Sequence, residues 1–238
     1  MSEISTIRDR LPQDVFDYLA LVDCLREYRK PRDRIQRLVT SGDIVRIRKG
    51  LYAFAAPLRR QPIVRQQLAN LIYGPSYVSL DSALNYHGLI PERVEAVTSV
   101  TTGRSRHFDT PFGTFSYQML AATRYAVGAL LLPEKSPSFL MASPEKALAD
   151  KLWTDKRFAG TRVGDFGPYL LDDLRIDPQA LRALGTARLD AIGQAYDSPK
   201  IGNLLRFLGR LRGGGKNRIS QRGSPQAFAA GCGRATRR

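Results

Sequence analysis

The sequence has few of the residues that build disulfide frameworks, metal centres or membrane spans. Two cysteines and two histidines occur among 238 residues. Cys24 lies in a helical pattern and Cys232 in a glycine-rich stretch, so a disulfide is not indicated and a reducing compartment is expected. The longest apolar run, residues 125–133, is too short to span a bilayer. Since no secretory leader pattern opens the chain, it is predicted to be cytoplasmic and not membrane-bound.

Acidic residues are scarce relative to basic ones. There are 37 Lys and Arg against 22 Asp and Glu, which gives a formal charge of +15. This surplus favours a polyanionic partner, nucleic acid before an anionic membrane surface. Nine of the basic residues and no acid lie between Arg206 and Arg238, so +6 belongs to the rest of the chain. Residues 212–238 have no apolar period and are predicted to be a basic, disordered tail, to which we assign no role.

Metal-binding patterns are weak. Cys24, His87, His107 and Cys232 lack the spacing of a zinc site. No glycine-rich phosphate loop follows a predicted strand. Neither a metal nor a cofactor is therefore expected.

Catalytic patterns are weak as well. Ser79 and Ser82 lie near His87, but Ser79 suits a helix N-cap and His87 a helix-end histidine bonded to a carbonyl. A carboxylate set for a nuclease metal would be Asp81, Glu145 and Asp150. Against it, Glu145 falls in a helix start and Asp150 on a face expected to be solvated. The protein is predicted not to be an enzyme.

Residues 31–54 carry the clearest pattern. Ile35, Leu38 and Val39 recur at helical spacing, which predicts a short amphipathic helix over residues 32–41 that Gly42 ends. Residues 44–48 then alternate apolar and basic side chains and predict a strand. Lys49 and Gly50 form its turn, and residues 51–55 return.

A helix, a tight stop and a basic hairpin in this order are typical of the second half of a winged helix-turn-helix. The helix would enter a DNA major groove and the hairpin, or wing, would reach phosphates or a minor groove. The predicted DNA-binding residues are the six cations of these two elements: Arg32, Arg34, Arg37, Arg46, Arg48 and Lys49. The alternative is an ordinary solvated helix and hairpin, but a surface that serves only solubility mixes charges of both signs.

The predicted fold class is α+β, with an N-terminal winged helix-turn-helix domain over residues 1–60 and a mixed C-terminal domain over residues 61–211. Residues 1–12 are expected to be frayed. Val15, Phe16, Leu19 and Val22 have helical spacing and predict a supporting helix.

In the second domain the apolar patterns predict helices and strands in alternation, with short helices at the end. The predicted helices cover 64–73, 79–88, the segment that Ser143-Pro144-Glu145 starts, 165–174, 178–184, 188–196 and 199–211; the strands cover 94–102, two within 106–118, 126–132 and 139–142.

Three segments together resemble one protein family. They are GDIVRIRKGLYAF (42–54), YVSLDSALNYHGLIPE (77–92) with VEAVTSVTTGR (94–104), and FGTFSY (112–117) with SPEKALADKLW (143–153). Their order and spacing resemble the AbiEi family, the antitoxins and transcriptional regulators of bacterial type IV toxin–antitoxin and abortive-infection (phage defence) systems. The likeness covers roughly residues 12–200, and the basic, glycine-rich end departs from the family pattern.

The resemblance implies an N-terminal winged-helix domain that represses its own operon and a C-terminal domain that carries antitoxicity. The implied partners are double-stranded operator DNA, with dimeric occupancy conceivable, and a nucleotidyltransferase-like toxin that need not form a stable complex. Two alternatives stay open: a winged-helix module that docks a protein without binding DNA, and a nuclease-like enzyme.

Overall fold

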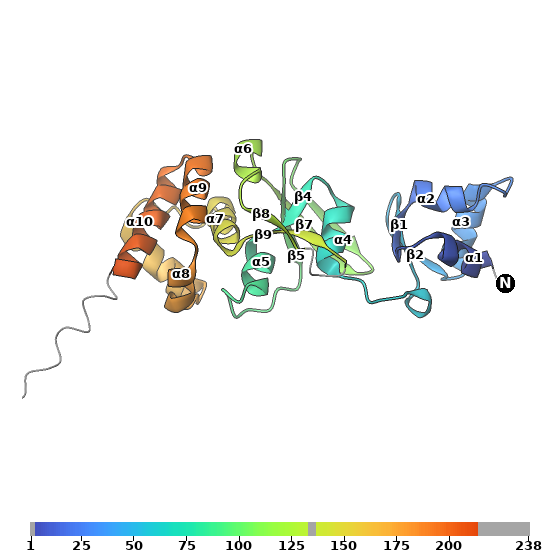
Figure 1. Ribbon diagram of the computed structural model, residues 1–238, viewed down its shortest axis with the longest axis horizontal. Helices are drawn as coiled ribbons and strands as arrows, with labels where there is room; N and C mark the ends of the chain where they lie inside the picture. Colours follow the sequence, from blue (N-terminus) through green and yellow to red (C-terminus); the bar gives the residue numbers. More distant parts are fainter. Residues whose placement is uncertain (1–2, 133–136, 214–238) are drawn as a thin grey trace, which may run out of the picture.

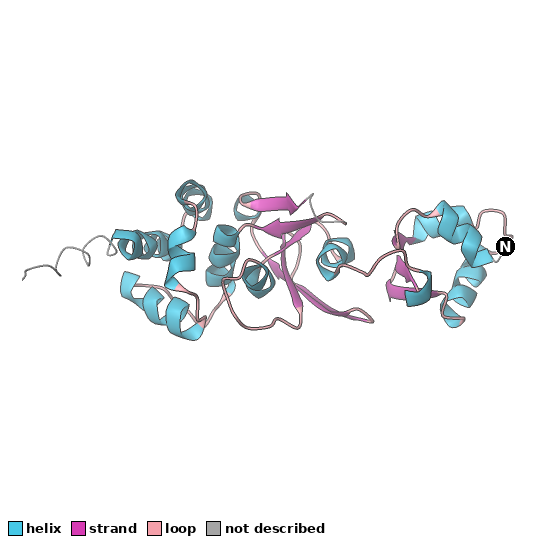
Figure 2. Ribbon diagram, turned by 60° about the horizontal axis from the view of Figure 1, so that its bottom comes forward, coloured by secondary structure: helices cyan, strands magenta, loops and turns pink. Residues whose placement is uncertain are grey.

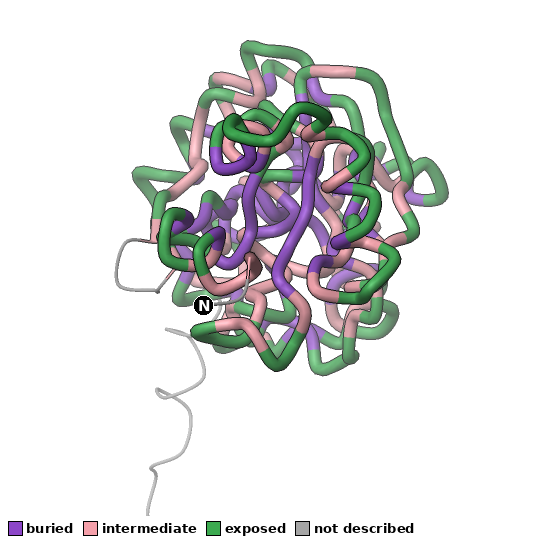
Figure 3. The backbone as a smooth tube through the Cα atoms, turned by 90° about the vertical axis from the view of Figure 1, so that its right-hand side faces the viewer, coloured by how far each residue is buried: buried purple, intermediate pink, exposed green. Residues whose placement is uncertain are grey.

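The computed structural model describes residues 3–132 and 137–213. The fold is a mixed α+β one with two lobes (Figure 1). We call residues 3–58 the N-terminal lobe and residues 65–213 the second lobe. Each lobe has a hydrophobic core, and the segment 59–64 joins them. Buried backbone runs through the middle of the molecule and exposed segments surround it (Figure 3).

The N-terminal lobe packs helices on one face of a small antiparallel sheet with strand order β1-β3-β2. Its elements in chain order are α1 (Glu3–Arg10), β1 (Val15–Asp17), α2 (Tyr18–Cys24), α3 (Pro31–Thr40), β2 (Ile44–Arg48), β3 (Leu51–Phe54) and the 3₁₀ turn η1 (Ala56–Leu58).

The predicted helix and hairpin of residues 31–54 are confirmed, and their local causes are visible. Pro31 occupies the first helical turn of α3, while Ile35 and Leu38 are buried. Gly42 has φ +79° directly after the helix, where a side chain would be strained. Gly50 has φ +84° in the two-residue turn of the hairpin.

Two predictions for the first 25 residues are wrong. Residues 3–10 form α1 instead of a frayed end, because Ile7 is buried in the core of the lobe. Val15 and Phe16 belong to β1 instead of a helix, and they pair with Ala53 and Tyr52 of β3. The helix begins only at Tyr18, where the Asp17 carboxylate accepts a hydrogen bond from the Ala20 amide at 2.8 Å.

The second lobe is built around a six-stranded mixed sheet with strand order β6-β7-β5-β4-β9-β8. Figure 2 shows this sheet between helix α4 on one side and α5 and α7 on the other. The elements are α4 (Arg65–Ile72), β4 (Ser76–Val78), α5 (Leu80–Tyr86), β5 (Val97–Thr101), β6 (Arg106–Thr110), β7 (Gly113–Met119), α6 (Ala122–Tyr125), β8 (Ala129–Leu132), β9 (Phe139–Ala142) and α7 (Pro144–Thr154).

Short helices complete the second lobe at the end away from the N-terminal lobe (Figure 1). They are η2 (Val163–Asp165), the π-helix η3 (Pro168–Asp173), α8 (Pro178–Ala183), α9 (Thr186–Tyr196) and α10 (Pro199–Gly213). The four short helices predicted past residue 157 are thus confirmed within a few residues. The predicted tail from residue 214 onward lies outside the described residues.

The start of α7 is confirmed, but the environment of Asp150 is not the predicted one. The Ser143 hydroxyl caps α7 by accepting from the Lys146 amide at 3.2 Å. Asp150, expected on a solvated face, is fully buried and pairs with the Lys146 ammonium at 2.7 Å. The Ser79 side chain, expected to cap α5, instead donates to Asp150 at 2.6 Å. Residues 145–150 of α7 are all buried, so this helix has no solvated face at Asp150.

The two lobes touch through the rear face of the small sheet. Val15, Ile47, Leu51 and Ala53 point away from the helices of their own lobe and are buried in the same cluster as the core of the second lobe. Arg59, in the joining segment, lies over the Phe112 ring of the second lobe at 5.0 Å. Among the described residues, no helix is both long and apolar enough to cross a membrane.

Candidate nucleic-acid interface

Helix α3 presents a polar face to solvent. Arg32, Gln36 and Thr40 follow one another at intervals of four residues, and all three are exposed, as is Arg37. Arg32 donates a hydrogen bond to the Tyr18 hydroxyl at 3.1 Å, so its guanidinium is oriented by an uncharged partner. This face combines two long cations with an amide, which are side chains that recognise phosphates and base edges.

The hairpin of β2 and β3 supplies the remaining cations. Arg46, Arg48 and Lys49 are exposed, and in the part of the chain that the structure describes none of them forms an ion pair. Arg46 stands opposite Tyr52 in the strand register, and the pairing shifts by one residue between Arg46 and Arg48. Because partners in register share a face, Arg46 lies on the helix side with Tyr52, whereas Arg48 lies with Leu51 and Ile47 on the rear side of the sheet.

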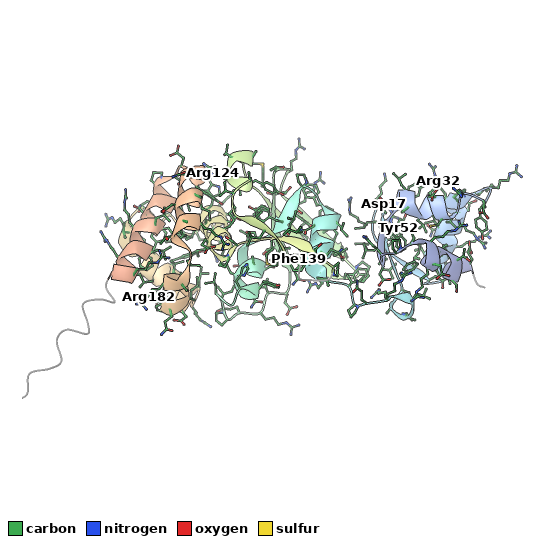
Figure 4. The ribbon with its side chains drawn as sticks, in the orientation of Figure 1. Asp17, Arg32, Tyr52, Arg124, Phe139 and Arg182 are labelled. Carbon is green, nitrogen blue, oxygen red and sulfur yellow. The ribbon has the colours of Figure 1, made fainter. Side chains whose placement is uncertain are left out.

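A hollow of about 550 Å³ lies between α3 and the hairpin. Its lining combines three cations with two tyrosines, a glutamine, an isoleucine and a glycine: Arg32, Arg46, Lys49, Tyr18, Tyr52, Gln36, Ile35 and Gly50. Figure 4 shows Arg32 on the helical side of this lobe and Tyr52 on the sheet side. The hollow brings together three of the six predicted cations, one from the helix and two from the hairpin, whereas Arg34, Arg37 and Arg48 do not line it.

Arg34 lies apart from the other predicted residues. Its side chain is 32% exposed and forms an ion pair with Glu3 of α1 at 2.6 Å. Its guanidinium also lies 5.0 Å from the Tyr28 ring. The hydrogen bond with Glu3 raises the pKa of Arg34 further above its usual range. Arg34 thus ties α3 to α1, and its charge is already neutralised by a neighbour.

The acids near the interface are engaged in local turns. Asp17 caps α2, and Asp43 accepts from the Ser41 hydroxyl at 2.5 Å in the turn after α3. Asp33 is the exposed acid in the first turn of α3, where the positive end of the helix dipole favours it. The exposed cations of the helix and hairpin outnumber these acids, so the net charge of the surface is positive.

The structure does not bring the candidate catalytic residues together. Asp81 pairs with Lys151 at 2.8 Å, Glu145 accepts from the Gly185 amide at 2.7 Å, and Asp150 is buried against Lys146. Within residues 3–132 and 137–213 there is no group of three or more His, Cys, Asp or Glu side chains that could hold a metal ion.

The two conspicuous histidines and the first cysteine have structural surroundings. His87 contacts the Ala142 carbonyl at 2.8 Å, as a helix-end histidine does. His107 pairs with Asp109 on an exposed strand. Cys24 is a free, buried thiol whose pKa is raised by burial. Cys232 lies outside the described residues.

Sequence reasoning missed three members of the interface. Gln36, Tyr18 and Tyr52 line the hollow with the cations, yet the sequence analysis named only charged residues. Gln36 had a readable signal, because it stands four residues after Arg32 on the same helical face. The two tyrosines lie on β3 and at the start of α2, and only the folded lobe places them there.

Comparisons of the chain with protein-family models and with curated proteins find no match.

Proposed function

We propose that this protein is a sequence-specific DNA-binding regulator whose N-terminal lobe is a winged helix-turn-helix. In this assignment α2 and α3 are the helix-turn-helix, α3 is the recognition helix, and β2 and β3 are the wing. The observation that carries the proposal is the hollow in which Arg32, Arg46 and Lys49 face a common space between helix and wing. A duplex is the polyanion whose grooves accept a helix and a hairpin side by side.

Roles follow from the chemistry of each side chain. Arg32 and Gln36 stand on the outer face of α3 and can contact base edges, since arginine pairs with guanine and glutamine with adenine in the major groove. Arg37, Arg46, Arg48 and Lys49 are exposed cations without a protein partner among the described residues and serve as phosphate contacts. Arg34 is assigned a role in the stability of the lobe because its guanidinium forms an ion pair with Glu3.

The resemblance to the AbiEi family extends the proposal to the role of the protein in the cell. The protein represses its own operon and acts as the antitoxin of a type IV toxin–antitoxin system, against a nucleotidyltransferase-like toxin. The second lobe, with its own core and its own six-stranded sheet, carries the antitoxin activity. Co-expression tests this part: the full chain should restore growth to cells that express the toxin from the neighbouring gene, and growth arrest that persists would contradict it.

DNA binding is tested by electrophoretic shift with a duplex taken from upstream of the gene that encodes this chain. The double variant Arg46→Ala/Lys49→Ala should bind that duplex and a generic one more weakly. The slope of log K against log salt concentration should become less steep by about 1.8, because two phosphate contacts are lost. Gln36→Ala should lose about 1–3 kcal/mol on the upstream duplex alone.

The matched control is Lys156→Ala/Arg210→Ala, which removes two exposed cations from the second lobe. It should bind like the wild type, and all variants should keep the wild-type melting temperature. The proposal fails if the wild type does not prefer the upstream duplex, or if the wing variant and the control behave alike.

A further inference from the structure

A second pair of unpaired cations lies on the second lobe, in and beside the turn between β5 and β6. Arg104 and Arg106 are both exposed, and among the described residues neither guanidinium forms a hydrogen bond or an ion pair. On the same strand β6, His107 is already engaged by Asp109. Two free guanidinium groups therefore remain on this edge of the sheet.

The turn that carries Arg104 is held in place. The Gly103 amide donates to the Thr101 hydroxyl at 3.1 Å, and the Met119 amide donates to the Ser105 hydroxyl at 2.9 Å. Gly103 also lies so close to the Tyr73 hydroxyl that a β-carbon would approach it within 2.6 Å. A turn braced in this way loses little conformational freedom when it binds a ligand, which favours a binding role.

Arg106 is the first residue of the edge strand β6, beside β7. In the register of β6 and β7 it stands opposite Tyr117, and the Tyr117 hydroxyl donates to the Ala69 carbonyl of α4 at 2.7 Å. Figure 1 shows α4 as the helix of the second lobe nearest to β1 and β2.

The junction between the lobes fixes this arrangement. Ile47 and Leu51, from the two strands of the wing, are buried in the same apolar cluster as Tyr117. Arg59 covers the Phe112 ring in the turn between β6 and β7. The cations of the wing and those of the β5–β6 turn are thus carried on one connected frame.

We propose that Arg104 and Arg106 bind the phosphate backbone of the same duplex, next to the segment that α3 and the wing hold. The inference rests on the proposed DNA-binding function and extends it: the second lobe is part of the DNA interface, and the bound site is longer than a single winged helix covers. The contact is to phosphate and carries no base specificity, because a turn with two arginines offers charge and no groove-shaped element.

The test compares two upstream duplexes, one that just spans the winged-helix site and one extended by roughly 10 bp, one helical turn, on each side. Wild type should bind the longer duplex more tightly and with a steeper salt dependence. Arg104→Ala/Arg106→Ala should lose that gain. On the longer duplex only, the slope of log K against log salt concentration should become less steep by about 1.8. Arg104→Lys/Arg106→Lys should restore the slope, and Lys156→Ala/Arg210→Ala should leave both duplexes unaffected.

Each result decides the matter. If the Arg104→Ala/Arg106→Ala variant keeps the gain on the longer duplex, the inference is overturned while the winged-helix proposal stands. If it weakens the short duplex equally, the two arginines do not act on flanking DNA and the inference is likewise wrong. If the wild type binds neither duplex in preference to generic DNA, the proposed function falls and this inference falls with it.

Discussion

Lys146 and Asp150 form a buried ion pair that holds four elements of the second lobe together. The Lys146 ammonium donates to Asp150, to the Tyr196 hydroxyl at 2.8 Å and to the Arg124 carbonyl at 2.8 Å. Tyr77, Tyr196 and Ser79 donate to the Asp150 carboxylate. Every charged atom in the pair therefore has a partner, as a buried charge requires.

Removing one member of this pair should be severe. Asp150→Ala leaves the Lys146 ammonium buried without its counter-charge, and we expect a loss of about 3–5 kcal/mol in the unfolding free energy of the second lobe. The double variant Lys146→Met/Asp150→Leu removes both charges and should lose less than the single variant. Urea unfolding of the full chain measures both. A double variant as unstable as Asp150→Ala would show that the hydroxyl partners, and not the charges, dominate.

The lowered pKa of Asp155 predicts that the stability of the fold depends on pH. The hydrogen bond from Arg157 is the largest cause that holds the pKa of Asp155 below its usual range, and the Tyr169 hydroxyl adds a second bond at 2.8 Å. A carboxylate with a lowered folded pKa stabilises the protein above its unfolded pKa of about 3.9. That stability is lost as pH falls below this value toward the folded pKa.

Comparing Asp155→Asn with the wild type checks the sign. The variant should be less stable at pH 6, and the difference should shrink as the pH is lowered below about 4. Melting temperatures across this range measure it, with Asp172→Asn as an exposed control. A constant difference at every pH would mean that Asp155 acts by packing alone.

At the scale of elements, the hairpin of residues 44–54 shows what the sequence can predict. Its apolar and basic residues predict a strand and Gly50 predicts the turn, although both faces of β2 prove to be buried, at Ile44 and at Ile47. By contrast, α1 has only Ile4 and Ile7 as apolar residues, and two positions at helical spacing are too few to predict a helix. β1 has three residues and is defined by its partner β3. Such elements depend on contacts that are distant in sequence.

Gly50 gives an element-scale prediction. Its φ of +84° suits glycine, and a β-carbon there would meet no atom within 4 Å, so Gly50→Ala acts through backbone strain alone. We expect a loss of about 1 kcal/mol in stability, with a smaller loss for Gly50→Asn, which tolerates this conformation better. Thermal unfolding measures both variants. Equal losses would argue that the turn changes shape in both.

For the candidate interface, the sequence predicted which elements carry charge but not how that charge is shared. Arg32, Arg34 and Arg37 look equivalent along the chain, yet Glu3, 31 residues away from Arg34, neutralises only that one. Arg46 and Lys49 meet Arg32 across a hollow because the sheet packs behind α3. Pairing between distant residues sets both outcomes, so helical or strand periodicity does not contain them.

At the scale of the whole molecule, the rear face of the small sheet depends on the second lobe. Val15, Ile47, Leu51 and Ala53 are buried only because the two lobes meet there. The pair Ile47→Thr/Leu51→Thr should cost the full chain about 1–3 kcal/mol per buried hydroxyl, since neither hydroxyl has an evident partner. In residues 1–62 alone, where this face meets water, the same pair should improve solubility. Urea unfolding of the full chain measures the stability, and light scattering of the short fragment measures its aggregation. A full chain that keeps its stability, or a fragment that aggregates more, would contradict the interface.

The placement of Lys146 has a consequence for chemical labelling. Surface lysines such as Lys49 and Lys156 meet an acylating reagent directly, whereas the Lys146 amine is sealed between α7, α9 and the carbonyl of Arg124. It can react only while those elements are apart. Peptide mapping over time gives the rate at which Lys146 is acylated. That rate reports how often the second lobe opens, without any added probe.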